Sequence, residues 1–332
     1  PRIGGKALPL DDYELDKIYS DVYEDPSGQK VVTIFKITKA HIHNKNSKPR
    51  EEFEDYKDDN IEEEKASAER FKNEFSSDRK MQSFYKKRRY LFSKYDEGIK
   101  LDEESWYSVT PEPIAKHITD RINEVFPDQE VNVLDAFAGC GGNIIQFALG
   151  CNNVFGCEID EIKKQYCATN CSIYDVKNYK ICLKDYLTVT AEDFDNKKIN
   201  AVFLSPPWGG VGYTQMSRYR FEYMHPNFND TLSKSLEFSN NLILYIPRNT
   251  DVKEICSVLT VYSKLLNRPG RENQVVFEIE RLGNQHAATS VLAIYTGELA
   301  RINNEEIAEH LCENYLNLPL EETSSDECKI GI

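Results

Sequence analysis

The sequence lacks the features that would place the chain in a membrane or in a secretory compartment. It has no apolar run of the roughly 18 to 20 residues that span a bilayer, and residues 1–10 lack the apolar stretch of a signal peptide. Its nine cysteines are odd in number and include no C-x-x-C pair, which argues against a disulfide framework. We therefore expect a soluble, intracellular chain with reduced thiols.

Other common sites are also missing. The dinucleotide fingerprint G-x-G-x-x-G does not occur, so no pyrophosphate needs to be inferred. Cys167 and Cys171 are four residues apart in an expected helix, but no second ligand pair stands nearby, and we favour two small buried residues. Four histidines also lack partners and are interpreted as structural or surface residues: His41, His43, His117 and His286. We predict no metal site.

The charge is acidic but unevenly distributed. The 332 residues carry a net charge of −14, with 12 Lys/Arg against 17 Asp/Glu in residues 1–70 and 2 against 8 in residues 301–332. Residues 78–101, by contrast, hold eight Lys/Arg, Lys86 among them, against three Asp/Glu, with five aromatic residues interleaved. This mixture suits a ligand with phosphates and stacking bases. A solvated helix face with inward-facing aromatics explains the segment equally well.

Composition divides the chain into four zones. We interpret residues 1–75 as a weakly ordered or accessory acidic leader, and residues 76–130 as a small helical subdomain. Its clearest helix begins with Thr110 as a cap and Pro111 at the first position, followed by an apolar stripe of Ile114, Ile118, Ile122 and Val125. Residues 131–300 form the main domain, and residues 301–332 form a C-terminal helix and a polar tail.

The main domain alternates short apolar runs with helix-like segments, which predicts a mostly parallel α/β sheet. The expected parallel strands are residues 131–136, 153–159, 179–183, 201–205 and 242–247. Residues 274–280 and 288–296 follow with only a short loop between them and predict an antiparallel hairpin at the sheet edge.

A glycine-rich turn leaves the first of these strands. Residues 134–143 read Leu-Asp-Ala-Phe-Ala-Gly-Cys-Gly-Gly-Asn, with Asp135 at the strand end and Gly139 and Asn143 in the turn. Glycines let a ligand approach the backbone closely at the carboxyl end of a sheet. The next strand ends at Glu158, where an acid can accept both hydroxyls of a ribose. Each feature alone is commonly a turn or a cap, but together they favour a nucleoside cofactor.

A second motif, Ser205-Pro206-Pro207-Trp208, ends the fourth strand. Two prolines fix the backbone and remove two N–H donors, so the Ser205 and Pro206 carbonyls are left to accept hydrogen bonds. Trp208 offers a face for a planar ring. The alternative is a structural role, in which the prolines stiffen the end of the strand and Trp208 is buried. Gly209 and Gly210 disfavour this alternative, because they leave the site open.

These motifs resemble class I S-adenosylmethionine-dependent methyltransferases, and Ser205 to Trp208 is similar to the (Asn/Asp/Ser)-Pro-Pro-aromatic motif of those that methylate amino groups. The chain more closely resembles the trimethylguanosine synthase family, which converts the 7-methylguanosine cap of small nuclear and nucleolar RNAs to the 2,2,7-trimethyl form. The resemblance runs from about residue 85 to 299 and rests on residues 95–102, 106–112, 135–139, 141–143, 146–149 and 203–210. It implies a class I Rossmann-like fold with a seven-stranded sheet.

The resemblance also implies roles for single residues. Asp135 and Glu158 would hold S-adenosylmethionine, with Glu158 on the ribose, and Asp185 would meet the adenine amine. The residues that would fold the helical segment over cofactor and cap are Tyr95, Ser108 and Thr110. The residues that would bind and orient the cap are Trp208, stacked on the guanine, Ser205 and Pro206 at the amino group, and Arg248, Asn249 and Lys86 at the phosphates.

Alternatives remain open from the sequence. One is an amino-methyltransferase that acts on another nucleobase or on a protein glutamine, and another is a cap-binding protein without activity. We expect a monomer in the nucleus, with the nucleolus as its main site and the cytoplasm as a further one. The acidic leader is either a solvated disordered tract, which we favour, or a binding segment for a protein partner.

Overall fold

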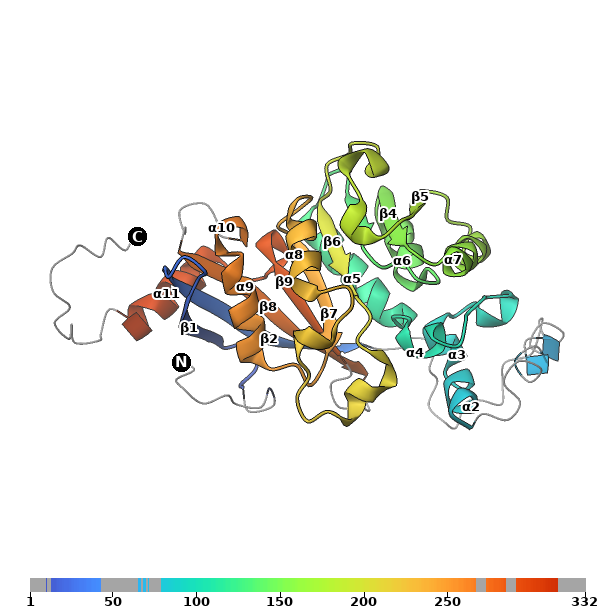
Figure 1. Cartoon of the computed structure of the whole chain (residues 1–332), viewed down its shortest axis with the longest axis horizontal. Coiled ribbons are helices and arrows are strands. Elements are labelled where there is room, and N and C mark those ends of the chain that lie inside the picture. Colours follow the sequence, from blue (N-terminus) through green and yellow to red (C-terminus); the bar gives the residue numbers. More distant parts are fainter. Residues whose placement is uncertain are drawn as a thin grey trace.

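Nine strands among the described residues form one sheet (Figure 1). The computed structural model describes Leu10 and residues 13–42, 65–66, 68–69, 71, 79–266, 273–284 and 291–315. The strands are β1 (Ile18–Glu24), β2 (Lys30–Ile42), β3 (Asn132–Asp135), β4 (Asn153–Glu158), β5 (Tyr179–Leu183), β6 (Ala201–Leu204), β7 (Leu242–Pro247), β8 (Gln274–Asn284) and β9 (Val291–Thr296). Their order in the sheet is β1-β2-β8-β9-β7-β6-β3-β4-β5.

The predicted α/β fold is confirmed. The five expected parallel strands, β3 to β7, begin and end within one residue of the predicted positions, and they pair in parallel in the order β5-β4-β3-β6-β7. The predicted hairpin is also present, because β8 and β9 pair antiparallel. Strand β9 pairs antiparallel with β7. The seven neighbouring strands β8-β9-β7-β6-β3-β4-β5 thus form a mostly parallel unit within the sheet.

The predicted strand count of seven is wrong, because the leader contributes two further strands. Strand β2 pairs in parallel with β8 from Val32↔Gln274 to Ile42↔Asn284, and β1 pairs antiparallel with β2. The hairpin is therefore inside the sheet instead of at its edge. The tract at residues 51–64, His43, His286 and the tail after residue 315 lie outside the described residues.

Helices cover both faces of the sheet. One face packs against α5 (Glu112–Val125), α6 (Gly142–Gly150) and α7 (Glu161–Ile173), and the other packs against α8 (Phe228–Leu236) and α9 (Val252–Val261). Helix α11 (Asn304–Tyr315) closes the end that the leader strands form, where Ile307 packs with Ile34 and Val276. Strands β1 and β2 with α11 lie at one end of the molecule, and β4, β5 and α7 at the other (Figure 1).

A helical segment precedes the main domain, as predicted. It contains α2 (Arg79–Tyr85), α3 (Arg88–Leu91), the 3-10 turn η2 (Tyr95–Glu97), α4 (Ser105–Ser108) and α5. The indole of Trp106 is buried at its centre, and the ring centroid of Tyr95 lies 5.2 Å away. The predicted cap of α5 is corrected: Pro111 holds the cap position, and the Thr110 hydroxyl instead accepts a hydrogen bond from Asn143 at 3.1 Å.

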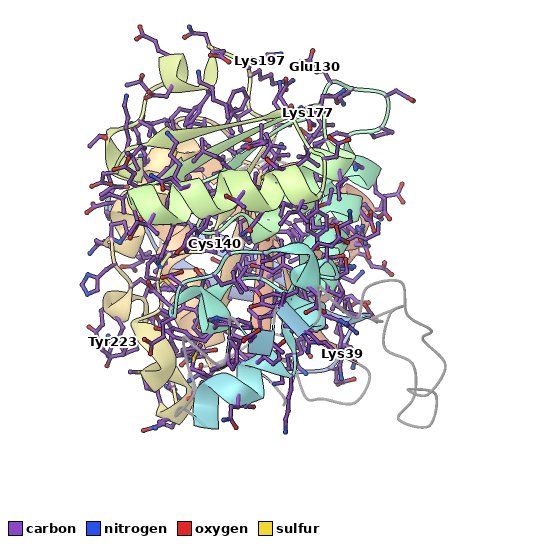
Figure 2. The ribbon with its side chains drawn as sticks, turned by 90° about the vertical axis from the view of Figure 1, so that its right-hand side faces the viewer. Lys39, Glu130, Cys140, Lys177, Lys197 and Tyr223 are labelled. Carbon is purple, nitrogen blue, oxygen red and sulfur yellow. The ribbon has the colours of Figure 1, made fainter. Side chains whose placement is uncertain are left out.

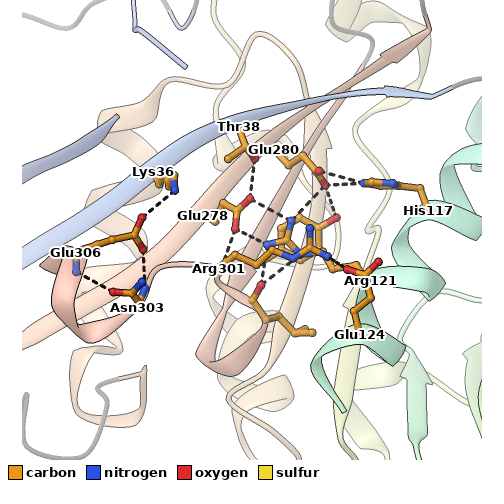
Figure 3. Close-up of polar contacts among 12 residues, drawn as sticks. Lys36, Thr38, His117, Arg121, Glu124, Glu278, Glu280, Arg301, Asn303 and Glu306 are labelled. Atoms are coloured by element: carbon orange, nitrogen blue, oxygen red, sulfur yellow. Dashed lines mark hydrogen bonds and ion pairs between the residues drawn. The ribbon is translucent and has the colours of Figure 1, made fainter. Parts of the chain in front are cut away.

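A buried arginine joins this segment to the sheet (Figure 3). Arg121 of α5 is 1% exposed, and its guanidinium donates to both carboxylate oxygens of Glu278 on β8. It also donates to the Leu299 carbonyl at 3.3 and 2.8 Å, and it lies 3.6 Å from the ring centre of Tyr295. A buried charge is tolerated only when it is paired and hydrogen-bonded. Because Arg121 must meet Glu278 on β8, the contact fixes how α5 lies against the sheet.

The network extends outward through a second carboxylate. Glu280 accepts hydrogen bonds from the Tyr295 hydroxyl at 2.8 Å and contacts the His117 ring at 3.0 Å. Burial raises the pKa of Glu280, but His117 and Arg121 together hold it below its usual range. Thr38 of β2 donates to Glu278 at 2.7 Å. The network therefore ties the leader strand to β8 as well. His117 is partly exposed, as expected, and its ring also joins this network.

Replacing Arg121 should destabilise the whole fold. Arg121→Ala leaves Glu278 and Glu280 buried without their cation, and loss of one partner of a buried pair costs about 3 to 5 kcal/mol. Urea unfolding monitored by circular dichroism measures this loss. Arg301→Ala is the matched control, because the Arg301 pair with Glu124 is exposed and should cost less than about 1 kcal/mol. Equal losses in the two variants would contradict the structural role of Arg121.

Candidate active site

Three neighbouring parallel strands end at one edge of the sheet and bring the two sequence motifs together. Strand β3 lies between β4 and β6, and Asp135 pairs in register with Gly156 and Phe203. The carboxyl ends of these strands therefore place Asp135, Glu158 and Ser205 side by side. A cleft of about 570 Å³ lies there, and the predicted residues that line it are Ser108, Thr110, Gly139, Asn143, Glu158, Asp185, Ser205, Pro206 and Trp208.

The glycine turn forms the floor of the cleft and lets the helical segment approach. Gly139 and Gly141 have φ values of +52° and +93°, a region that side chains disfavour. A Cβ atom on Gly142 would lie 2.6 Å from Val109 Cγ2. Cys140 lies between α7 and the helical segment (Figure 2), and its thiol is 3.0 Å from the Ser105 hydroxyl. Small residues are therefore required where the two parts meet.

Glu158 is held by backbone amides. Its two carboxylate oxygens accept hydrogen bonds from the N–H groups of Gly139 and Asp160, each at 2.8 Å. The side chain stays half-buried in the cleft wall, so it keeps lone pairs that face the cleft. This geometry suits the acceptance of hydroxyl hydrogens.

Asp135 is more deeply placed. It is 0% exposed, and its Oδ1 atom accepts a hydrogen bond from the Phe137 amide at 3.1 Å, while Oδ2 has no partner. Burial raises the pKa of Asp135 to about 7, against the opposing effect of the Phe137 amide, and the charge of Glu158 raises it further. A buried, half-satisfied carboxyl is costly unless a cationic group approaches it. Asn143 Oδ1 is a second buried acceptor without a partner.

Trp208 is held on two sides in the opposite wall. Its indole N–H donates to the Tyr245 carbonyl at 3.2 Å. Its ring packs edge-on against Tyr213, with centroids 5.0 Å apart, and tilts over Tyr245 at 5.6 Å. The indole is half-buried and lines the cleft. A fixed, half-covered aromatic ring provides a stacking surface with little rotational freedom to lose.

The remaining predicted residues differ in their placement. Tyr95 is buried inside the helical segment and does not line the cleft. Asp185 does line the cleft, and its carboxylate caps the turn that follows β5 by accepting a hydrogen bond from the Leu187 amide. Asn249 donates to the carbonyls of Tyr213 at 3.1 Å and Met216 at 2.8 Å. Its amide hydrogens thus hold a loop and are not directed to a phosphate in this conformation.

Arg248 and Lys86 are exposed and lie outside the cleft lining. Burial raises the pKa of the Tyr213 hydroxyl, and the positive charge of Arg248 opposes that rise. Arg248 is therefore close to the ring that packs on Trp208. No comparable link to the cleft is described for Lys86 of the helical segment.

Sequence reasoning missed several residues that shape the site. Asn170 of α7 is buried and bonds the backbone of Lys100 and the carbonyl of Cys140, so it joins the helical segment to the glycine turn. Tyr245 of β7 forms the base under Trp208. A single polar residue in a helix and one aromatic in an apolar strand carry no sequence signal for such roles.

Within the described part of the chain, no group of three His, Cys, Asp or Glu side chains could hold a metal ion. The Cys167 and Cys171 sulfurs are 4.0 Å apart and both residues are buried. None of the described helices is long and apolar enough to cross a membrane.

Comparison with known proteins identifies the kind of site. Residues 130–295 match the sequence model of the family described as RNA cap guanine-N2 methyltransferase. The trimethylguanosine synthase of Schizosaccharomyces pombe is 38% identical over 188 residues, which are 55% of this chain and 77% of that protein. The chain belongs to the RNA cap guanine-N2 methyltransferase family. It is thus an S-adenosylmethionine-dependent enzyme whose substrate is capped RNA.

Two further proteins are similar. The trimethylguanosine synthase of Saccharomyces cerevisiae is 37% identical over 183 residues, which are 53% of this chain and 57% of that protein. Among solved structures, TYW2 of M. jannaschii in complex with AdoMet matches 55% of this chain and 74% of its own, with 16% identity and a TM-score of 0.35.

The residues present fit the cofactor of this family. S-adenosylmethionine carries a sulfonium and an ammonium group, and Asp135 and Asn143 have buried oxygen atoms that lack partners beside the glycine turn. Glu158 ends β4 and accepts a hydrogen bond from the amide of Gly139, 19 residues earlier in the chain. At this place beside the glycine turn it can accept the hydroxyl hydrogens of a ribose. Asp135, Asn143 and Glu158 are on these grounds the candidates for holding the cofactor.

Asp135→Asn should remove a pH effect on stability. Folding raises the pKa of Asp135 from 3.8 to about 7, so the unfolded chain loses this proton at a lower pH than the folded chain. The carboxyl therefore costs stability progressively as the pH rises from 4 to 7. Asn cannot ionise, so the stability advantage of the variant should grow over that range to at most roughly 4 kcal/mol, as measured by urea unfolding without cofactor.

The same variant should bind S-adenosylmethionine more weakly, because a neutral amide replaces the carboxylate that a cation favours. Calorimetric titration at pH 7.5 measures this affinity. Asp120→Asn is a control, because Asp120 forms an exposed ion pair with Lys116 and neither residue lines the cleft. A variant that gains no relative stability with pH, or binds the cofactor as the wild type does, would contradict the assignment of Asp135.

Proposed function

We propose that the enzyme converts the 7-methylguanosine cap of small nuclear and small nucleolar RNAs to the 2,2,7-trimethylguanosine form by two successive methyl transfers to N2. The observation that carries this proposal is the position of Ser205-Pro206-Pro207-Trp208 in the wall of the cleft that also contains Asn143 and Glu158. The similarity to two trimethylguanosine synthases supports the choice of product.

Trp208 supplies the recognition of a methylated guanine. A 7-methylguanine ring carries a positive charge, and its stacking on an electron-rich indole gains a cation–π contribution of about 1 to 2 kcal/mol that ordinary guanine lacks. The contacts of Trp208 with Tyr213 and Tyr245 fix the plane in which the guanine stacks. The cap is therefore bound in a plane that the protein sets in advance.

Ser205 and Pro206 orient the amino group. Guanine N2 is a poor nucleophile because its lone pair is delocalised into the ring. The Ser205 hydroxyl and the Pro206 carbonyl can accept its hydrogens and so direct the remaining lone pair. Proline at positions 206 and 207 keeps these acceptors stiff, because it fixes φ and removes competing N–H donors. Holding reacting atoms about 3 to 3.5 Å apart in the correct orientation supplies much of the rate enhancement in such a site.

S-adenosylmethionine, when bound, supplies a methyl group that is already activated by its sulfonium. The protein therefore needs no strong base, since the alkylated nitrogen becomes acidic and can lose its proton to water. Glu158 in the opposite wall and Asp135, which is buried behind the cleft lining, keep the cofactor in place and complement its charge. Ser205 in one wall therefore orients the amino group of the guanine, and Glu158 in the other wall orients the cofactor.

Arg248 meets the triphosphate that links the cap to the RNA. It is exposed after β7 and its charge acts on Tyr213, beside the stacking ring. A guanidinium suits phosphate oxygens because it offers several donors in one plane. Lys86 of the basic helical segment is a further phosphate ligand. The RNA class implies residence in the nucleus and nucleolus, which a fluorescent fusion of the full chain tests.

Trp208 variants test the proposal. With a 7-methylguanosine-capped dinucleotide as substrate, Trp208→Ala should lower kcat/KM about 10- to 100-fold, because base stacking contributes about 1 to 3 kcal/mol. Trp208→Phe keeps an aromatic face and should lose clearly less. Methyl transfer from labelled S-adenosylmethionine measures both variants.

The controls separate recognition from folding. Both variants should bind S-adenosylmethionine as the wild type does, because Trp208 lies in the opposite wall from Glu158. Unchanged cap methylation by Trp208→Ala would show that the ring does not bind the guanine, and loss of cofactor binding would show that the site has collapsed.

A further inference from the structure

The loop between β6 and α8 is exposed but firmly anchored. Residues 214–218 are all exposed, yet Asn249 holds the loop through the carbonyls of Tyr213 and Met216. The Tyr219 amide donates to the Asn249 carbonyl at 2.9 Å, and Arg218 pairs with Asp251 at 2.9 Å. An exposed loop that is fixed this well acts as a platform, because its side chains are presented in one arrangement.

A row of aromatic rings leads from the cap-stacking residue to this platform. Tyr213 packs edge-on against Trp208, Tyr219 against Tyr213 at 6.3 Å, and Tyr223 against Tyr219 at 6.0 Å between ring centroids. The Tyr219 hydroxyl also donates to the Trp208 carbonyl at 3.3 Å. The first ring lines the cleft and the last, Tyr223, lies at the rim of the molecule (Figure 2).

The outer part of the platform combines aromatic and basic side chains. Tyr223 is 40% and Met216 is 38% exposed, and the side chains of Arg218 and Arg220 are each 58% exposed. Residues 209–226 carry these two arginines against a single acid, Glu222, in a chain whose net charge is −14. The Arg220–Glu222 pair is exposed on both sides, so it is weak and can be exchanged for a phosphate.

We propose that this platform, formed by Met216, Arg218, Arg220 and Tyr223, binds the transcribed nucleotides that follow the first one in the capped RNA, as a single strand. The inference rests on the proposed function, since it requires the cap to stack on Trp208. Exposed aromatic faces stack on bases, and arginines beside them neutralise the backbone. The platform is continuous with the cap site through the row of rings, so an RNA leaving the triphosphate meets it next.

The choice of a single strand follows from the platform itself. A single strand can turn its bases onto Tyr223 and Met216, whereas a duplex hides its base faces and would contact only the arginines. The platform therefore adds affinity for RNA beyond the cap without reading its sequence, because every base has a face that can stack.

Two substrates separate the platform from the cap site. One is the 7-methylguanosine cap dinucleotide, which carries only the first transcribed nucleotide and so ends before the platform, and the other is a capped, unstructured RNA of about ten nucleotides. The wild type should show a KM for the longer RNA about 10-fold lower, since stacking of one base contributes a factor of this order. A third substrate with the same nucleotides in a blunt duplex should lose this advantage.

Variants of the platform should affect only the longer RNA. Tyr223→Ala should raise its KM about 10-fold and leave the dinucleotide kinetics unchanged, while Tyr223→Phe should retain near wild-type kinetics. Arg220→Ala should weaken the salt dependence, lowering the slope of log KM against log salt by about 0.7 for one lost phosphate contact on a single strand. Lys177→Ala is the matched control, because Lys177 is 85% exposed and lies away from Tyr223 (Figure 2).

Three results would overturn the inference. They are equal wild-type KM values for the two capped substrates, an equal loss on both substrates in Tyr223→Ala, and a duplex bound as well as the single strand. Failure of the proposed function is a different result, because the wild type would then not methylate the dinucleotide at all.

Discussion

The parallel pairing of β3 with β4 and β6 is the constraint on which the site depends. Because these strands run the same way, their carboxyl ends meet at one edge, and Glu158 and Ser205 to Trp208 line one cleft there. Neither motif would form a site alone. The two prolines stiffen one wall, while backbone amides hold Glu158 in the other. Under the proposed function, the protein fixes cofactor and guanine in separate walls, and the sheet aligns the two.

The helical segment turns this open edge into a cleft, and buried polar contacts hold it in place. Arg121 joins it to the sheet, Asn170 joins it to the glycine turn, and Glu112 accepts hydrogen bonds from Ser93 and the Tyr174 hydroxyl. Such contacts are costly to leave unsatisfied, so they define one docking position. The lack of a side chain at Gly142 then allows the close approach that brings Thr110 to the cleft.

The sequence predicted the parts that depend on local pattern. The β-branched runs marked β3 to β7 to within one residue, and the cleft residues of both motifs came from their place at strand ends. It could not reveal β1, because Ile18 to Glu24 is half polar and is stabilised by its pairing with β2. Arg121 was equally hidden, since its partner Glu278 lies 157 residues away. Asn249 was expected at a phosphate from the family resemblance, yet its amide holds a loop, a contact that only the tertiary structure determines.

One measurement tests the central claim most directly: methyl transfer from labelled S-adenosylmethionine to two capped dinucleotides that differ only in the methyl group on N7, with detection of the products by mass. The account predicts a gain of two methyl groups on the N2 atom of the 7-methylated substrate and none on the other. Equal methylation of both would contradict the role of cationic stacking on Trp208. Transfer to neither, with the cofactor still bound, would contradict the cap as substrate.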